Sequence, residues 1–136
     1  MNVKSTTGLG VAKLSNHAQR TAKDPRRLQK LLEDSKDKIG KLAKDDEKVK
    51  GILGVLRTFM RMIRAYLKGE YQVVPWKTLL LIVAALIYFV SPLDFIPDFI
   101  PITGFIDDVS IVVWVFSRIQ KDIREFEAWE GMKYEL

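Results

Sequence analysis

The feature that most constrains this chain is the stretch 75–116, which has no lysine or arginine between Lys77 and Arg118. It opens with Pro75 and Trp76, and twelve consecutive apolar residues follow at positions 79–90. A second apolar run occupies positions 109–116, and the charges between the two runs are four aspartates. This pattern is typical either of a membrane hairpin or of the core of a small helical bundle.

The first apolar run is close to the length that crosses a bilayer. As a helix, residues 75–90 would measure about 24 Å, and adding Val73 and Val74 approaches the ~30 Å hydrocarbon core. Nine Leu, Ile, Val or Phe side chains within 79–90 would favour insertion by roughly 3 to 5 kcal/mol. The second run cannot cross alone, and extending it backward adds aspartates that each cost about 2.5 to 3.5 kcal/mol at mid-membrane.

The charges that flank the two apolar runs predict an orientation. Basic residues lie before the first run and after the second, whereas the connection between them carries acids alone. By the positive-inside rule, this predicts a membrane hairpin with both termini in the cytoplasm. We favour the hairpin over a soluble bundle on this ground.

Charge is divided unevenly along the 136 residues. Residues 1–75 hold 17 Lys or Arg and 8 Asp or Glu, whereas residues 76–136 hold 5 and 9. The basic first half predicts an acidic partner, and anionic lipid fits it better than nucleic acid, because acids interrupt the basic residues and no stacking aromatics accompany them. The absence of cysteine excludes disulfides and thiolate metal sites.

The first half of the chain predicts a tail followed by a long helical region. Residues 1–23 are polar and predict a mobile tail, and Asp24 before Pro25 is a helix-start signal. Alternating steps of four and three from residue 28 to residue 67 meet an apolar residue at ten of twelve positions. This 28–67 heptad seam predicts either self-association or protein binding as a coiled coil, or a helix resting on its own domain. Gly51 and Gly54 are expected to bend or break the helix.

A basic stripe marks the end of this helical region. Arg57, Arg61, Arg64 and Lys68 share one narrow face, and apolar residues cover most of the remaining circumference. A wide apolar face with a basic stripe is typical of a helix that lies in a membrane interface, where each cation binds anionic lipid. The alternative is a helix of a bundle with its arginine face in water.

Four aspartates are the candidate ligands of a cation. Asp94 and Asp98 lie in a proline-rich turn, and Asp107 and Asp108 lie near the start of the last apolar run. If they converge, they could bind a divalent cation or share a proton. Helix caps and turns explain the same residues, and we favour that explanation. No other cofactor is expected, and no catalytic residues stand out.

The same region resembles a known family. The string Y-F-V-S-P-L-D-F-I-P-D-F-I-P at 88–101, with Gly104 and the Asp107–Asp108 pair, is similar to the signature of the YkvA-like proteins, a bacterial domain family of unknown function. The similarity extends over about residues 66–124. The resemblance implies a small multi-pass or membrane-associated helical domain in the bacterial inner membrane. It implies no established activity, and the motif acids correspond to the four aspartates named above.

Taken together, these observations predict an all-α protein. The expected parts are a flexible tail at 1–23, a charged amphipathic helical arm at 24–50, a membrane-associated helical domain at 51–128 and a tail at 129–136. The function that we favour is a non-enzymatic scaffold that binds lipid and protein partners. The alternatives are a transport or sensor module that uses the aspartates, and a soluble or peripheral helical-bundle interaction protein. A metal-dependent hydrolase is disfavoured because no nucleophile and base pair is visible.

Overall fold

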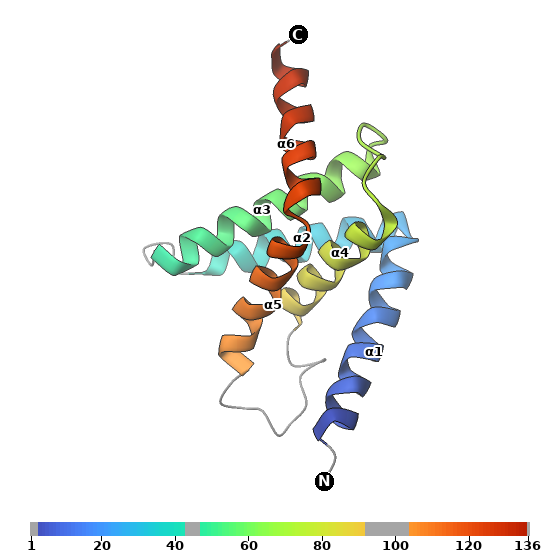
Figure 1. Cartoon of the computed structure of the whole chain (residues 1–136), viewed down its shortest axis with the longest axis vertical. Coiled ribbons are helices and arrows are strands. Elements are labelled where there is room, and N and C mark those ends of the chain that lie inside the picture. The colour runs from blue at the N-terminus through green and yellow to red at the C-terminus, as the bar shows by residue number, and fades with distance from the viewer. Residues whose placement is uncertain (1–2, 43–46, 92–103, 136) are drawn as a thin grey trace.

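The structure is a computed structural model of the whole chain, and it describes residues 3–42, 47–91 and 104–135. Within these ranges it has no strand and six helices: α1 Val3–Ala22, α2 Pro25–Lys41, α3 Glu47–Leu67, α4 Trp76–Val90, α5 Gly104–Arg118 and α6 Gln120–Glu135 (Figure 1). The all-α class predicted from the sequence is therefore confirmed.

Helix α4 is the central helix of the bundle. It contacts α1, α2, α3 and α5, and Figure 1 shows it between α1 and α5. Nine of its 15 residues are buried: Thr78, Leu79, Ile82, Val83, Ala85, Leu86, Ile87, Tyr88 and Phe89. A helix that is apolar all round must be covered on every side, and here neighbouring helices cover it.

This arrangement differs from the predicted transmembrane hairpin. At 15 residues, α4 is about 22 Å long, which is shorter than a ~30 Å hydrocarbon core. Across the described ranges, no helix combines the length and the apolar character that crossing a bilayer requires. The apolar run at 79–90 packs against protein in this structure.

The heptad seam is buried inside the chain. Helices α2 and α3 contact each other and α4, and the seam supplies much of the core. Its fully buried apolar members are Leu28, Leu32, Ile39, Leu53, Leu56, Met60 and Ile63. The structure thus agrees with a helical region that rests on its own domain. Binding of a second copy or another protein through this seam stays a prediction, and it would require α2 or α3 to separate from their neighbours.

Two helix ends are explained by residues adjacent in the sequence, and the first of them was predicted. The Asp24 carboxylate accepts a hydrogen bond from the Arg26 backbone N–H at 3.0 Å, and Pro25 opens α2. Gly69, with φ +73°, follows α3, where the Glu70 N–H donates to the Ala65 carbonyl and the Gly69 N–H to the Tyr66 carbonyl. These two bonds form the Schellman motif, which favours glycine at this position.

The predicted break at Gly51 and Gly54 is wrong, because α3 runs through both. Both glycines are exposed, and a Cβ at either would meet no atom within 4 Å. Each still costs helix stability of about 1 kcal/mol relative to alanine. Packing of the buried face of α3 offsets this cost, since tertiary contacts supply most of the stability of a helix in a protein.

The structure also differs at both ends of the chain. Residues 3–22, expected to be part of a mobile tail, form α1, which contacts α2 and α4. Leu14, Ala18 and Ala22 recur every fourth residue on its packed side, and the two alanines are small enough for close approach to α4. At the other end, residues 129–135 of the predicted tail at 129–136 belong to the second half of α6. A turn at Ile119 separates α6 from α5.

Candidate functional site

The basic stripe predicted on residues 57–68 lies along one exposed face of α3. Arg57, Arg64 and Lys68 are exposed, and Arg61 is half-buried. All four belong to one helix at steps of four, three and four, so their side chains point to the same side. In the structure, the four residues of the basic stripe therefore lie on one face of α3.

The apolar side of α3 is not available to a bilayer. Phe59, Met62 and Ile63 are at most 1% exposed, because α2, α4 and α5 cover them. The prediction had placed this apolar face in a membrane interface, whereas in this structure it packs on neighbouring helices; binding of lipid by α3 stays a prediction. The part of α3 that can meet a surface is the basic stripe, as the bundle alternative expected.

The C-terminal half of the stripe lines a shallow groove between α3 and α6. The groove has a volume of about 240 Å³, and Arg61, Arg64 and Lys68 form its α3 side. Phe126, Trp129 and Glu130 form the α6 side. The spacing of Ile119, Ile123, Phe126 and Trp129 continues one helical face, and this face of α6 packs toward α3.

An ion pair fixes the two sides of the groove. The Arg61 Nε donates to Glu130 Oε2 at 3.0 Å, and Arg61 Nη2 donates to Glu130 Oε1 at 3.3 Å. Two parallel bonds orient the guanidinium more strictly than a single contact would. The Arg61 guanidinium is thus paired with a carboxylate of α6. Among the described residues, no ion pair to Arg57, Arg64 or Lys68 is found.

An aromatic cluster holds α6 against the connection that follows α3. The Tyr71 ring lies 5.1 Å from the Phe126 ring, centroid to centroid, and 5.0 Å from the Trp129 ring. Burial raises the pKa of the Tyr71 phenol above its ordinary value near 10, and the Glu125 and Asp122 carboxylates raise it further. The Thr78 hydroxyl donates to the Asp122 carboxylate and ties α4 to α6.

The aspartate cluster cannot be placed as a site. Asp94 and Asp98 lie outside the described residues, and Asp107 and Asp108 belong to α5 with side chains that are not described. In the part of the chain that is described, no group of three or more metal-ligating side chains comes together. Binding of a cation or a proton by the aspartates therefore stays a prediction.

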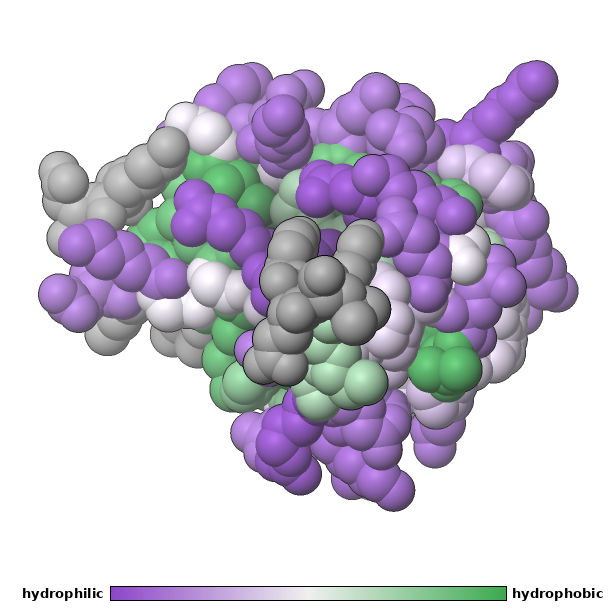
Figure 2. Space-filling view, turned by 90° about the horizontal axis from the view of Figure 1, so that it is seen from above, coloured by the Kyte–Doolittle hydropathy of each residue, from purple (hydrophilic) through white to green (hydrophobic). Residues whose placement is uncertain are grey.

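Some large apolar side chains reach the surface. Val113 and Trp114 of α5 are 50% and 52% exposed, and the Arg118 guanidinium lies 5.3 Å from the centroid of the Trp114 ring. Val73 and Met132 are also exposed. In the face seen from above in Figure 2, hydrophilic side chains dominate and hydrophobic ones reach the surface in separate patches.

Comparison with known proteins identifies the family. Residues 78–114, which span most of α4 and α5, match the family described as "Protein of unknown function (DUF1232)". Over 74 residues the chain is 42% identical to the uncharacterized membrane protein YkvA of Bacillus subtilis (strain 168). The alignment covers 54% of this chain and 70% of that protein. No solved structure matches. The resemblance carried by the proline and aspartate motif is thus confirmed, and the chain belongs to the YkvA-like family.

Proposed function

We propose that this protein is a non-enzymatic helical-bundle scaffold that binds the anionic surface of the bacterial inner membrane through the basic stripe of α3. A relative of 42% identity is described as a membrane protein, which supports an association with membranes. Because no described helix could cross a bilayer, attachment to the membrane surface accounts for that association most simply. The bundle would then lie on the cytoplasmic side together with both termini.

The observation that carries the proposal is the exposure of Arg57, Arg64 and Lys68 on a helix whose other side is buried. The fold presents these three cations to solvent in a row. A cation near an anionic leaflet contributes about 1 kcal/mol, so the three together contribute about 3 kcal/mol. This corresponds to a partition coefficient raised by about 100-fold.

The groove beside the stripe supports the same function. Trp129 lines it next to Arg64 and Lys68, and an indole ring beside cations suits the headgroup region of a bilayer. The Arg61–Glu130 ion pair holds α6 in place, so that Trp129 and the cations form one surface. The chain would therefore bind as a preformed face and lose little conformational entropy.

Co-sedimentation with vesicles tests the proposal. The wild-type chain should bind vesicles of phosphatidylcholine mixed with phosphatidylglycerol, and it should bind pure phosphatidylcholine far more weakly. Replacing Arg57, Arg64 and Lys68 by glutamine should lower the partition coefficient by about 100-fold. Added salt should weaken wild-type binding, because it screens exposed charges.

A matched control separates the stripe from net charge. Arg26, Lys36 and Lys41 are exposed on α2, and replacing them by glutamine removes the same three charges elsewhere. This variant should bind anionic vesicles much more tightly than the stripe variant. Equal losses in the two variants would show that net charge alone drives binding, and the assignment to α3 would then be wrong.

A further inference from the structure

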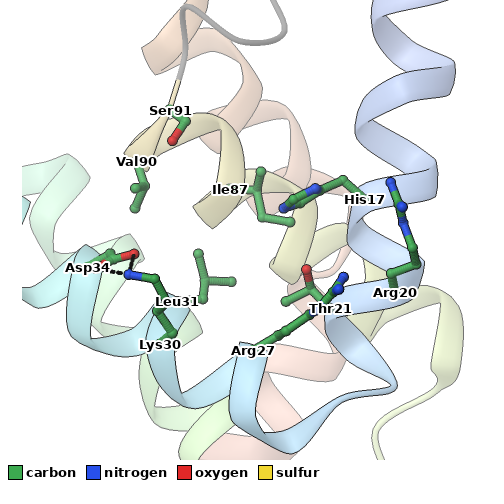
Figure 3. Close-up of a pocket in the computed structure, with 10 residues that line it drawn as sticks. All are labelled: His17, Arg20, Thr21, Arg27, Lys30, Leu31, Asp34, Ile87, Val90 and Ser91. Carbon is green, nitrogen blue, oxygen red and sulfur yellow. Dashed lines mark hydrogen bonds and ion pairs between the residues drawn. The ribbon is translucent and has the colours of Figure 1, made fainter.

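A second groove lies between α1, α2 and the end of α4, away from the basic stripe in sequence. It has a volume of about 410 Å³, within the range of roughly 300 to 1,000 Å³ that small-molecule sites occupy. Figure 3 shows its lining side chains, which come from these three helices. None of the residues proposed above to bind a membrane surface lines it.

The middle of this groove is apolar. Leu31 of α2 and Ile87 of α4 are 7% and 4% exposed, and Val90 at the end of α4 is half-buried beside them. Figure 3 shows Leu31 and Ile87 near the middle of the group and Val90 to one side, close to Ser91. Such a surface can cover a short hydrocarbon segment, which gains about 0.8 kcal/mol for each buried methylene.

Basic side chains lie on two sides of the apolar centre, with Lys30 beside Asp34 on one side and Arg20 and Arg27 on the other (Figure 3). Arg20 of α1 and Arg27 and Lys30 of α2 line the groove. Among the described lining residues Asp34 is the one acid, which leaves an excess of positive charge in this part of the groove. Lys30 Nζ lies 3.2 Å from Asp34 Oδ2, and Arg27 Nε lies 3.6 Å from Asp24 Oδ2. Both pairs face solvent, where an ion pair contributes little, so these cations can turn to an anionic ligand at small cost.

We infer that this groove binds one molecule of an anionic phospholipid. The phosphate would meet Arg20, Arg27 and Lys30, and the first part of an acyl chain would lie on Leu31, Ile87 and Val90. A nucleotide fits less well, because the described residues that line the groove include no Phe, Tyr or Trp that could stack on a base. The inference does not rest on the proposed function, since it concerns a single lipid molecule and a different face.

Calorimetric titration of the full chain with dihexanoyl phosphatidylglycerol, kept below its micelle concentration, tests the inference. The wild-type chain should show saturable binding with one site. Replacing Arg20 and Arg27 by glutamine should weaken it by about tenfold or more, because two charge-assisted bonds to phosphate are lost. A control with Lys23 and Arg26 replaced by glutamine removes two exposed cations nearby that do not line the groove, and it should bind like the wild type.

Two further ligands show which part of the phospholipid is responsible for binding. Dihexanoyl phosphatidylcholine has the same acyl chains with no net charge, and it should bind more weakly than the phosphatidylglycerol. Inorganic phosphate should bind more weakly as well, because it cannot use the apolar centre. Equal affinity for inorganic phosphate would overturn the assignment of a lipid, and absence of saturable binding, or an equal loss in the control variant, would overturn the site. The vesicle assay with the variant of Arg57, Arg64 and Lys68 tests the proposed function separately, and its result does not depend on these calorimetric outcomes.

Discussion

Lys38 of α2 donates a hydrogen bond to the backbone carbonyl of Phe89 in the last turn of α4. The same ammonium lies 4.9 Å from the centroid of the Phe89 ring. The last carbonyls of a helix lack partners within the helix and carry the negative end of its dipole, so a cation is stabilising there. Lys38 thus links α2 to the C-terminal end of α4, which directly precedes the proline and aspartate motif in the sequence.

Replacing Lys38 by methionine should lower the free energy of unfolding by about 1 to 2 kcal/mol. The substitution keeps most of the aliphatic stem and removes the charge and the donor. Urea denaturation of the full chain measures the change. Lys36→Met on the same helix is the control, because Lys36 is exposed, and it should change the stability by less than about 0.5 kcal/mol. Equal effects of the two substitutions would contradict the role of Lys38.

Gly69 and Gly51 should respond to alanine in opposite directions. At Gly69, φ is +73°, so Gly69→Ala should destabilise the chain by about 1 kcal/mol. At Gly51 the backbone is helical and the added Cβ meets no atom within 4 Å, so Gly51→Ala should stabilise it by about 0.5 to 1 kcal/mol. Thermal unfolding of both variants measures the two shifts. A stabilising effect at Gly69 would rule out the Schellman end of α3.

Ser35 has a side-chain hydroxyl that is buried without a hydrogen-bond partner in the described structure. Ser35→Ala removes this hydroxyl and should raise the free energy of unfolding by about 0.5 to 1.5 kcal/mol, because a buried polar group without a partner is costly. Ser117→Ala, at an exposed hydroxyl that donates to the Trp114 carbonyl at 2.8 Å, should be near neutral. Chemical denaturation compares the two, and a marked loss of stability in Ser35→Ala would reveal a partner for the hydroxyl.

Tyr71 should make the fold sensitive to alkaline pH. Its pKa is raised in the folded state, so above pH 10 the unfolded chain loses the phenol proton more readily. Its contribution to stability is therefore complete below about pH 10 and falls as the pH rises toward the folded-state pKa. Tyr71→Phe keeps the ring and should flatten the pH dependence of the unfolding free energy in this window. The difference in tyrosinate absorbance between wild type and Tyr71→Phe checks the pKa, and a value at or below 10 would contradict the burial argument.

Local signals predicted much of the fold correctly. The Asp24–Pro25 start of α2 and the apolar run of α4 each depend on a few adjacent residues. The helix at residues 3–22 was not predicted, because the stripe of Leu14, Ala18 and Ala22 is narrow and weakly apolar, and it becomes a packing face only beside α4. The lining of the groove beside the basic stripe was not predicted for a different reason: Trp129 and Glu130 lie far from Arg61, Arg64 and Lys68 in the sequence, and only the fold brings them together.

The sequence by itself determined the all-helical class, the family and the row of cations at Arg57, Arg61, Arg64 and Lys68. It could not decide whether lipid or protein surrounds the apolar helix at 79–90. An apolar helix surface is shielded from water equally well by lipid tails and by aliphatic side chains. The tertiary structure decided that question, since α1, α2, α3 and α5 bury α4. It also decided which side of α3 is left to face a partner, because packing removes the apolar side from solvent and leaves the basic stripe exposed.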